Sequence, residues 1–336
     1  MENTMRKKIL LLWYTEEDNF GDVLIYQTVK EKLEASGFMV NYHEVGDKSI
    51  NIIQEANRND FLIFAGGGII ERYVPDIIKK FKKNKEKLFI PYGVIGLSIG
   101  EFDYEPYKEN LKCWVENAVF FYSRDSYTAN YLNNIAKMQK VICSGDVVLG
   151  NQRFYLLKDT TGSRKGINIR DIPYPDIMGE FNWEKLRKII NSINCKIVIP
   201  DSHNEILKAK IKFENQKELL EYLKLNRDKK IDLIIEQIQK CDFIIGMRYH
   251  VILIAALLGV IPLPIMYCPK VERLAEQLEI KDISSSLFDY ESIMKNYEWA
   301  ERHKDKIRKK MYERIEYMRT EVDQMFEKII CDITQN

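Results

Sequence analysis

Residues 242–266 read DFIIGMRYHVILIAALLGVIPLPIM, and this stretch decides the fold. The apolar run at residues 243–245 predicts a buried strand, and the uncharged segment after it predicts a buried helix that reaches Leu258. Gly259 then caps the helix, and residues 260–266 form a second buried strand, because the two prolines in that run are poorly tolerated inside a helix. A strand, a helix and a second strand in this order predict a parallel sheet covered by helices.

The same alternation of apolar runs and charged, helix-periodic segments continues along the rest of the chain. A polar stretch at residues 149–165 separates two such series and indicates a domain boundary. We therefore expect an α/β protein with two Rossmann-like domains facing a cleft, at residues 1–155 and 160–290, and a helical segment at residues 291–336 that packs back. The expected strands are 9–14, 38–45, 61–64, 88–99, 118–122, 141–143, 166–169, 196–199, 242–245 and 260–266, and the expected helices of the first domain are 23–36, 75–85, 104–117 and 126–134.

Composition excludes several classes of protein. The chain has 336 residues, 46% of them apolar, which is enough for two domain cores. With 51 basic and 50 acidic residues the formal net charge is +1, so no overall field attracts a nucleic acid. The six cysteines are scattered without a CxxC pair, which excludes the usual zinc and redox motifs and favours a reducing cytoplasm over a disulfide scaffold.

No membrane-spanning segment is expected from the sequence. The uncharged span at residues 249–269 is long enough to cross a bilayer, but Gly259 and two prolines interrupt it. The apolar run at residues 9–12 meets three acidic residues almost at once, so it predicts a first strand rather than a signal peptide.

Ligands of open parallel sheets bind beyond the carboxyl ends of the strands, so residues that follow strands are the candidates for function. Arg248 and His250 follow a very apolar strand and enter the most apolar helix of the chain. A cation and an imidazole oppose the macrodipole at a helix start, and a bound anion would offset them. Arg124 follows another expected strand, just before Asp125 or Ser126 caps the next helix. A structural histidine and a surface arginine in an ion pair are the alternatives.

Two further candidate sites in the first domain are rich in small residues. The first strand is followed by Asn19, Gly21 and Asp22 just before a helix, where the glycine permits a tight turn. The strand at residues 61–64 is followed by three glycines that allow a ligand to approach the backbone, although a sharp turn alone would also explain them. These are Gly66, Gly67 and Gly68.

Other charged residues are candidates on position alone. Arg170, Asp201 and His203 follow strands of the second domain. The basic run at residues 79–87 is expected to be a solvated helix face, with contact to an anionic acceptor or a lipid phosphate as the alternative.

Taken in order, these motifs resemble those of the polysaccharide pyruvyl transferase family, over about residues 9–280. The chain continues after the Arg-x-His motif with AALLGVIP at 255–262 and YCPK at 267–270, as the family does. Tyr249 stands inside the Arg-x-His motif where an aliphatic residue is commoner. The other matching motifs are NFGD at 19–22, GGG at 66–68, IGLSIG at 95–100, SRD at 123–125, GD at 145–146 and RYH at 248–250.

The resemblance implies a GT-B-like fold and the transfer of a pyruvyl group from phosphoenolpyruvate to two hydroxyls of a sugar, forming a cyclic ketal. The product would be a cell-surface polysaccharide, such as an exopolysaccharide or a capsule, or its lipid-linked precursor. It implies that Arg124 and Arg248 bind the oxyanions of the donor, that His250 protonates the enol, and that Lys270 adds a phosphate contact. Arg170 is a further implied substrate contact. The implied contacts on the acceptor side are Asn19, Gly21, Asp22, Gly66, Gly67 and Gly68.

The expected partners are phosphoenolpyruvate and a saccharide acceptor, with no metal and no separate cofactor. The sequence leaves open a lipid link on the acceptor, contact with the inner face of the membrane, and the oligomeric state. A nucleotide-sugar-dependent glycosyltransferase and a non-catalytic polysaccharide-assembly protein are the alternatives on the same fold. The set Arg124, Arg248 and His250 favours pyruvyl transfer, because it suits a small anionic donor and supplies no evident base-recognition motif.

Overall fold

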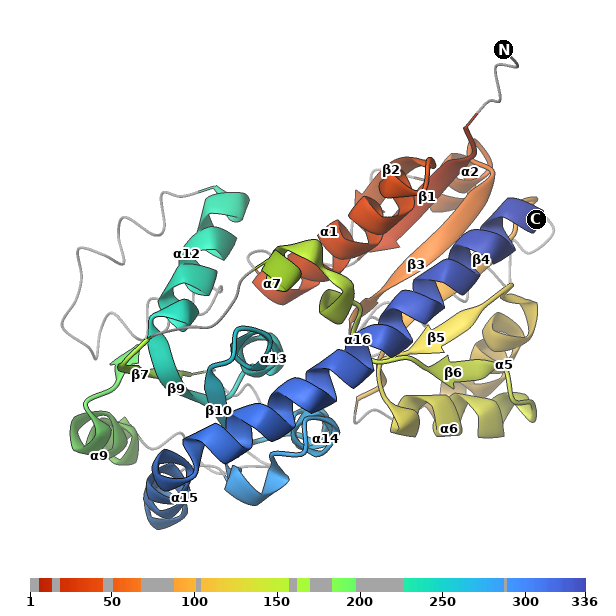
Figure 1. Ribbon diagram of the computed structural model, residues 1–336. Coiled ribbons are helices and arrows are strands. Elements are labelled where there is room, and N and C mark those ends of the chain that lie inside the picture. The colour runs from red at the N-terminus through yellow and green to blue at the C-terminus, as the bar shows by residue number, and fades with distance from the viewer. Residues whose placement is uncertain are drawn as a thin grey trace. The chain divides into compact units, whose positions relative to one another are not determined.

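A computed structural model describes residues 6–13, 19–44, 51–67, 88–100, 104–156, 162–169, 183–197, 226–286 and 289–336. The chain divides into two compact units, each built around a parallel sheet (Figure 1). The first unit comprises Met1–Glu16, Asp22–Gln152 and Met318–Asn336, and the second comprises Glu17–Gly21 and Arg153–Tyr317. The expected α/β class is therefore confirmed.

Within its described residues, the first unit holds a six-stranded sheet in the order β2-β1-β3-β4-β5-β6, and every strand pair is parallel. The strand order reverses between β1 and β3. Such a topological switch point is where open α/β sheets bind their ligands. The strands are β1 (Lys8–Trp13), β2 (Met39–Glu44), β3 (Phe61–Gly67), β4 (Tyr92–Leu97), β5 (Phe121–Ser123) and β6 (Val141–Cys143).

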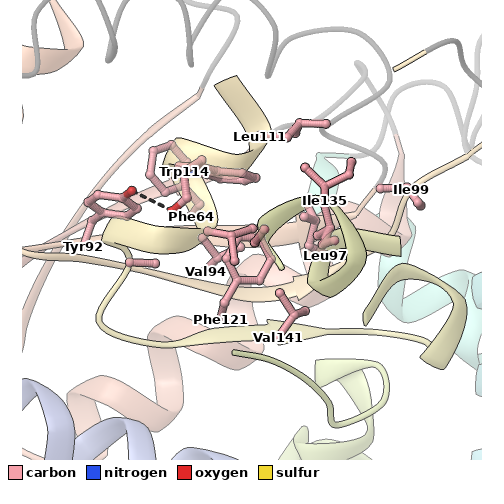
Figure 2. Close-up of a cluster of buried hydrophobic side chains, with 14 of the residues drawn as sticks. Phe64, Tyr92, Val94, Leu97, Ile99, Leu111, Trp114, Phe121, Ile135 and Val141 are labelled. Carbon is pink, nitrogen blue, oxygen red and sulfur yellow. Dashed lines mark hydrogen bonds between the residues drawn. The ribbon is translucent and has the colours of Figure 1, made fainter. Parts of the chain in front are cut away.

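Alternation along β1 sends its side chains to two buried faces of this sheet. On one face, Leu10 and Leu12 join a core cluster with residues of α5 (Lys108–Asn117) and α6 (Ser126–Ala136). Figure 2 shows this cluster around Trp114, whose backbone carbonyl accepts a 2.7 Å hydrogen bond from the Tyr92 hydroxyl. On the other face, Trp13 stacks on Tyr26 of α1 (Phe20–Ala35), with 4.6 Å between the ring centroids. A short helix, α2 (Ile52–Ala56), follows β2.

The described part of the second unit contains a five-stranded parallel sheet in the order β11-β10-β9-β7-β8. Its order reverses between β7 and β9, so both units repeat the same winding. The strands are β7 (Arg164–Asn168), β8 (Lys196–Ile197), β9 (Cys241–Gly246), β10 (Ile261–Met266) and β11 (Ser285–Ser286), and the helices are α9 (Trp183–Ile193), α12 (Arg227–Gln239), α13 (Tyr249–Leu257), α14 (Pro269–Gln277) and α15 (Tyr290–Arg302). The short helix α7 (Gln152–Leu156) begins in the first unit and ends in the second.

The decisive stretch of sequence folds as its pattern predicts. β9, α13 and β10 follow one another, and every residue of α13 is buried. Gly259 ends the helix with a φ of +73°, a left-handed conformation that glycine adopts without steric cost. Among the described residues, no helix is long and apolar enough to cross a membrane.

The carboxyl-terminal region is helical, as expected, and consists of two helices, α15 and the 32-residue α16 (Lys304–Gln335). The start of α16 belongs to the second unit, where Arg308 pairs with Asp242 at the beginning of β9. Its last part belongs to the first unit, where Asp323 pairs with Lys32 of α1 at 2.7 Å. The expected helix at residues 75–85 lies outside the described residues.

Several expected boundaries are wrong. The strand expected at residues 88–99 is Tyr92–Leu97, and the strand expected at 118–122 is Phe121–Ser123. Two further corrections concern glycines. The strand expected at residues 61–64 continues to Gly67. A Cβ built on Gly66 would lie 2.8 Å from the Gly96 carbonyl oxygen on β4, so only glycine fits at this point of the strand. The helix expected from residue 23 begins at Phe20, so Gly21 and Asp22 lie in its first turn rather than before it. A carboxylate there interacts favourably with the amino-terminal end of the helix dipole.

Candidate functional site

In the second unit, the sequence-predicted motif Arg248–Tyr249–His250 lies at the switch point of the sheet. β7 ends at Asn168 and β9 ends at Gly246, and these two residues lie opposite each other in the strand register. The chain leaves β9 through Met247 and enters α13, with Arg248 as its N-cap residue. A guanidinium has only hydrogen-bond donors, so this side chain cannot cap the first turn as Asp or Ser would. The motif therefore presents cationic and N–H donor groups where a ligand of this sheet would bind.

Asn168 holds the backbone of this motif and was not found from the sequence. Its side chain is fully buried. Its backbone carbonyl accepts the Met247 amide at 3.2 Å, and its Oδ1 accepts the Arg248 amide at 3.1 Å. The available signal was an asparagine between Ile167 and Ile169 in the expected strand at residues 166–169, where a buried polar side chain needs a hydrogen-bond partner.

In the second unit, His250 packs against Phe20 and Gly21. A Cβ built on Gly21 would lie 1.9 Å from the imidazole Nδ1, far closer than any real contact. The rings of Phe20 and Tyr249 make edge contacts with the imidazole, with 6.5 and 5.1 Å between the ring centroids. Gly21 is therefore needed because the imidazole occupies the space of its missing side chain. Two motifs that lie far apart in the sequence, at residues 19–22 and 248–250, meet at this contact.

Lys270 lies at the same edge of the second sheet. It is in the first turn of α14, which follows β10, and β10 is the neighbour of β9. The carboxyl ends of parallel strands share one edge, so Lys270 and Arg248 start from adjacent strand ends. Both side chains are partly exposed. The edge thus combines two cations with the buried imidazole of His250.

In the first unit, Asp22 and the glycines at the end of β3 come together at the other switch point. A Cβ built on Gly67 would lie 3.2 Å from the Asp22 carboxylate Oδ1, and Gly67 has a φ of +89°. A side chain at this position would be strained and would crowd the carboxylate. The glycine therefore brings the backbone of β3 close to Asp22.

Arg124 lies at the end of β5 in the first unit and is 4% exposed. Its Nη1 is 3.4 Å from the Asp146 carboxylate, which also accepts the Val148 amide. Asp125 caps α6 as expected, because its Oδ1 accepts the Thr128 amide at 2.9 Å. The guanidinium is therefore held in a buried ion pair, and the next residue caps a helix.

The remaining expected site residues have mixed outcomes. Asn19 lies just before α1 and is partly exposed. Gly68, Arg170, Asp201, His203 and the basic run at 79–87 lie outside the described residues. Within the part of the chain that the structure describes, no group of three or more His, Cys, Asp or Glu side chains is arranged to hold a metal ion. The metal-independent reaction stays a prediction.

Two buried thiols can be excluded as nucleophiles at neutral pH. Burial raises the pKa of the Cys195 thiol to about 12 and that of Cys241 to about 11. A nucleophilic cysteine needs its thiolate near pH 7, so these side chains are core residues.

Comparison with solved structures places this fold among two-unit α/β enzymes of the GT-B type. The UDP-GlcNAc 2-epimerase from Methanocaldococcus jannaschii aligns with a TM-score of 0.52 and 13% identity, over 87% of this chain and 92% of that one. An alpha-glucosyltransferase in complex with UDP aligns with a TM-score of 0.56 and 11% identity, over 98% and 100% of the two chains. At such low identity the likeness shows the fold alone.

The fold defines a two-unit α/β protein of the GT-B-like class. The polysaccharide pyruvyl transferase family model matches residues 19–269, most of the chain, so this protein belongs to that family. The matched region begins at Asn19 and contains Arg124 and the Arg248–His250 motif. No curated protein sequence matches the chain.

Proposed function

We propose that this protein transfers the pyruvyl group of phosphoenolpyruvate to two hydroxyls of a saccharide acceptor. The observation that carries the proposal is the placement of Arg248 and His250 at the switch point of the second sheet, where Gly21 leaves room for the imidazole. Family membership supports the reaction class.

The donor is a small trianion, and the cations of the site suit it. Arg248 has a planar guanidinium that forms paired hydrogen bonds with a carboxylate or phosphate. Lys270 supplies a second positive charge from the adjacent strand end. We assign these two side chains to the donor oxyanions. In this proposal Arg124 also binds a donor oxyanion, and its ion pair with Asp146 fixes the guanidinium.

The proposed chemistry needs one acid and an acceptor with two hydroxyls. His250 gives a proton to carbon three of the enol, which makes carbon two electrophilic. A sugar hydroxyl then adds to carbon two, the bond to the phosphate oxygen breaks, and the second hydroxyl adds to close the ketal. One hydroxyl proton replaces the proton that His250 gave, and the other leaves with inorganic phosphate. Cations near the leaving phosphate stabilise its developing charge.

In this proposal, Asp22 takes part on the acceptor side. Its carboxylate lies beside the Gly67 backbone at the switch point of the first sheet. A carboxylate there can accept a hydrogen bond from a sugar hydroxyl and draw off its proton as the new bond forms. Because Gly67 has no side chain, none stands beside the Asp22 carboxylate to block a sugar ring, whereas Gly66 packs against the Gly96 carbonyl on β4.

The test is phosphate release from phosphoenolpyruvate with a panel of galactosyl, glucosyl and N-acetylmannosaminyl acceptors, free and lipid-linked. Release should require an acceptor and add a pyruvyl mass to it, and His250→Ala and Arg248→Ala should abolish it. His303→Ala and Arg58→Ala are matched controls, because both side chains lie outside the site, in local contacts with Trp299 and Glu55. A wild-type protein that neither binds nor turns over phosphoenolpyruvate would refute the proposal.

A nucleotide-sugar-dependent glycosyltransferase is the second candidate, because the aligned structures with the same fold are nucleotide-sugar enzymes. A ligand that binds the folded protein raises its melting temperature by mass action. Stabilisation by UDP-sugars and none by phosphoenolpyruvate would favour this candidate. Stabilisation by phosphoenolpyruvate alone would exclude it.

A further inference from the structure

Asn168 combines complete burial with a polar side chain at the centre of the second switch point. It is the last residue of β7 and lies opposite Gly246 in the register. The preceding strand residue, Ile167, is a fully buried aliphatic, and such side chains are usual in a central parallel strand. A buried amide is costly unless its polar atoms are hydrogen-bonded, so this asparagine needs a specific reason.

The reason lies in two consecutive amides of the segment that follows β9. The Asn168 backbone carbonyl accepts the Met247 amide at 3.2 Å, which extends the β7–β9 ladder past the end of β9. The Asn168 Oδ1 then accepts the Arg248 amide at 3.1 Å. Consecutive amides of a regular strand point to opposite sides, so a backbone ladder with β7 could not take both, and the side-chain oxygen accepts the second. One residue holds both amides that lead into α13.

We infer that Asn168 is a positioning residue, whose Oδ1 fixes the backbone of Arg248 and thereby orients the donor-binding Arg248 and His250. This inference rests on the proposed function. Arg248 is the N-cap residue with an extended backbone, and His250 is two residues further in the first turn of α13. A shift of the Arg248 backbone therefore moves the guanidinium and tilts the turn that carries the imidazole. Asn168 acts through these two residues and needs no contact with the substrate.

The kinetic test is Asn168→Ala, which removes Oδ1 and keeps the backbone carbonyl. We expect the KM for phosphoenolpyruvate to rise about tenfold and the KM for the acceptor to stay within about twofold, because only the donor-binding groups are displaced. In an Arg248→Ala background, which is expected to be inactive, the same change should weaken phosphoenolpyruvate binding, measured by calorimetry, at most about twofold. A merely destabilised enzyme would lose apparent kcat with both KM values unchanged, and that result would overturn the inference.

Asn133→Ala is the matched control. Asn133 is also a buried asparagine, and its Oδ1 accepts the amides of Lys140 and Val141 at 2.9 and 2.8 Å. It holds the start of β6, at the opposite end of that strand from the candidate site. Its loss should lower the melting temperature without changing the KM for phosphoenolpyruvate. An equal rise in that KM would show that the effect of Asn168→Ala is not local, and would also refute the inference.

A second measurement works even if the protein does not use phosphoenolpyruvate. Hydrogen exchange of the Met247 and Arg248 amides, resolved by NMR in the full chain, reports the two hydrogen bonds directly. In Asn168→Ala the Arg248 amide should exchange at least about threefold faster relative to the Met247 amide. Asn168→Asp keeps an acceptor oxygen in the same place and should retain the protection. Unchanged exchange at Arg248 in the alanine variant would overturn the positioning role, whereas a wild type inactive with every acceptor would refute only the proposed function.

Discussion

Replacing Gly21 with alanine should displace His250 without disturbing the helix that carries the change. The new Cβ would lie 1.9 Å from Nδ1, whereas ordinary contact begins at 3.4 Å, so the imidazole must retreat by about 1.5 Å. Crowding of this kind costs about 1–3 kcal/mol of unfolding free energy. Alanine is a better helix former than glycine, so the substitution also adds up to about 1 kcal/mol to the unfolding free energy. The net loss of stability is therefore small.

The loss of activity should be large by comparison. A misplacement of about 1 Å in a catalytic group costs on the order of 100-fold in rate. We expect kcat/KM for phosphoenolpyruvate-dependent phosphate release to fall at least about 100-fold in Gly21→Ala. Gly37→Ala is the control, because Gly37 has a φ of +91° and no atom within 4 Å of its built Cβ. That variant should lose stability and keep its kcat/KM.

A double-mutant cycle tests the steric cause directly. In a His250→Ala background the ring is gone, so Gly21→Ala should no longer lower the melting temperature. This measurement needs no substrate and holds whatever reaction the protein catalyses. Wild-type activity in Gly21→Ala, or an undiminished stability penalty in the His250→Ala background, would refute the reasoning.

Three further outcomes follow from other described contacts. Lys270→Ala should raise the KM for phosphoenolpyruvate several-fold with little change in kcat, measured by steady-state kinetics, if the lysine binds ground state and transition state alike. Arg124→Ala should lower the unfolding free energy by about 3–5 kcal/mol in chemical denaturation, because it leaves the Asp146 carboxylate buried without its cation, and Asp146→Asn in the same background should recover part of the loss. Burial raises the pKa of Cys195 to about 12 and that of Cys241 to about 11. The folded state therefore favours the protonated thiols, and the stability that this contributes is complete below about pH 8.5 and is lost as the pH rises through 11–12. When these cysteines are replaced by alanine, the melting temperature should fall less steeply with pH over that range than in the wild type. Equal slopes in wild type and variants would contradict the raised thiol pKa values.

Much of the fold could be predicted from local chemistry. The apolar run before Arg248 and the left-handed glycine at position 259 predicted the strand, the helix and its end, because each depends on neighbours in the sequence. A helix cap at Asp125 or Ser126 was predicted for the same reason, and Asp125 is the cap, since its side chain accepts an amide three residues away.

The contacts that organise the candidate site could not be predicted in this way. Gly21 is needed because of His250, which lies more than 200 residues later in the sequence. No local sequence pattern predicts that an imidazole occupies the space beside Gly21. In the sequence Asn168 lies inside the expected strand at residues 166–169, and only the register shows that it ends the strand opposite Gly246. β3 continues past its expected end at residue 64 to Gly67, and Gly66 packs there against Gly96 of the neighbouring strand. Each of these features depends on a pairing between distant segments.

The last helix has a consequence for synthesis on the ribosome. Residues 318–336 belong to the first unit, where Val322, Ile329 and Ile333 are fully buried and Lys7 donates a 2.9 Å hydrogen bond to the Ile333 carbonyl. Domains usually fold in order as the chain emerges, the amino-terminal one first. Here the sheet that is made first lacks part of its apolar cover until residues 318–336 have left the exit tunnel. The second unit lies between these segments in the sequence, so the first unit completes its core last.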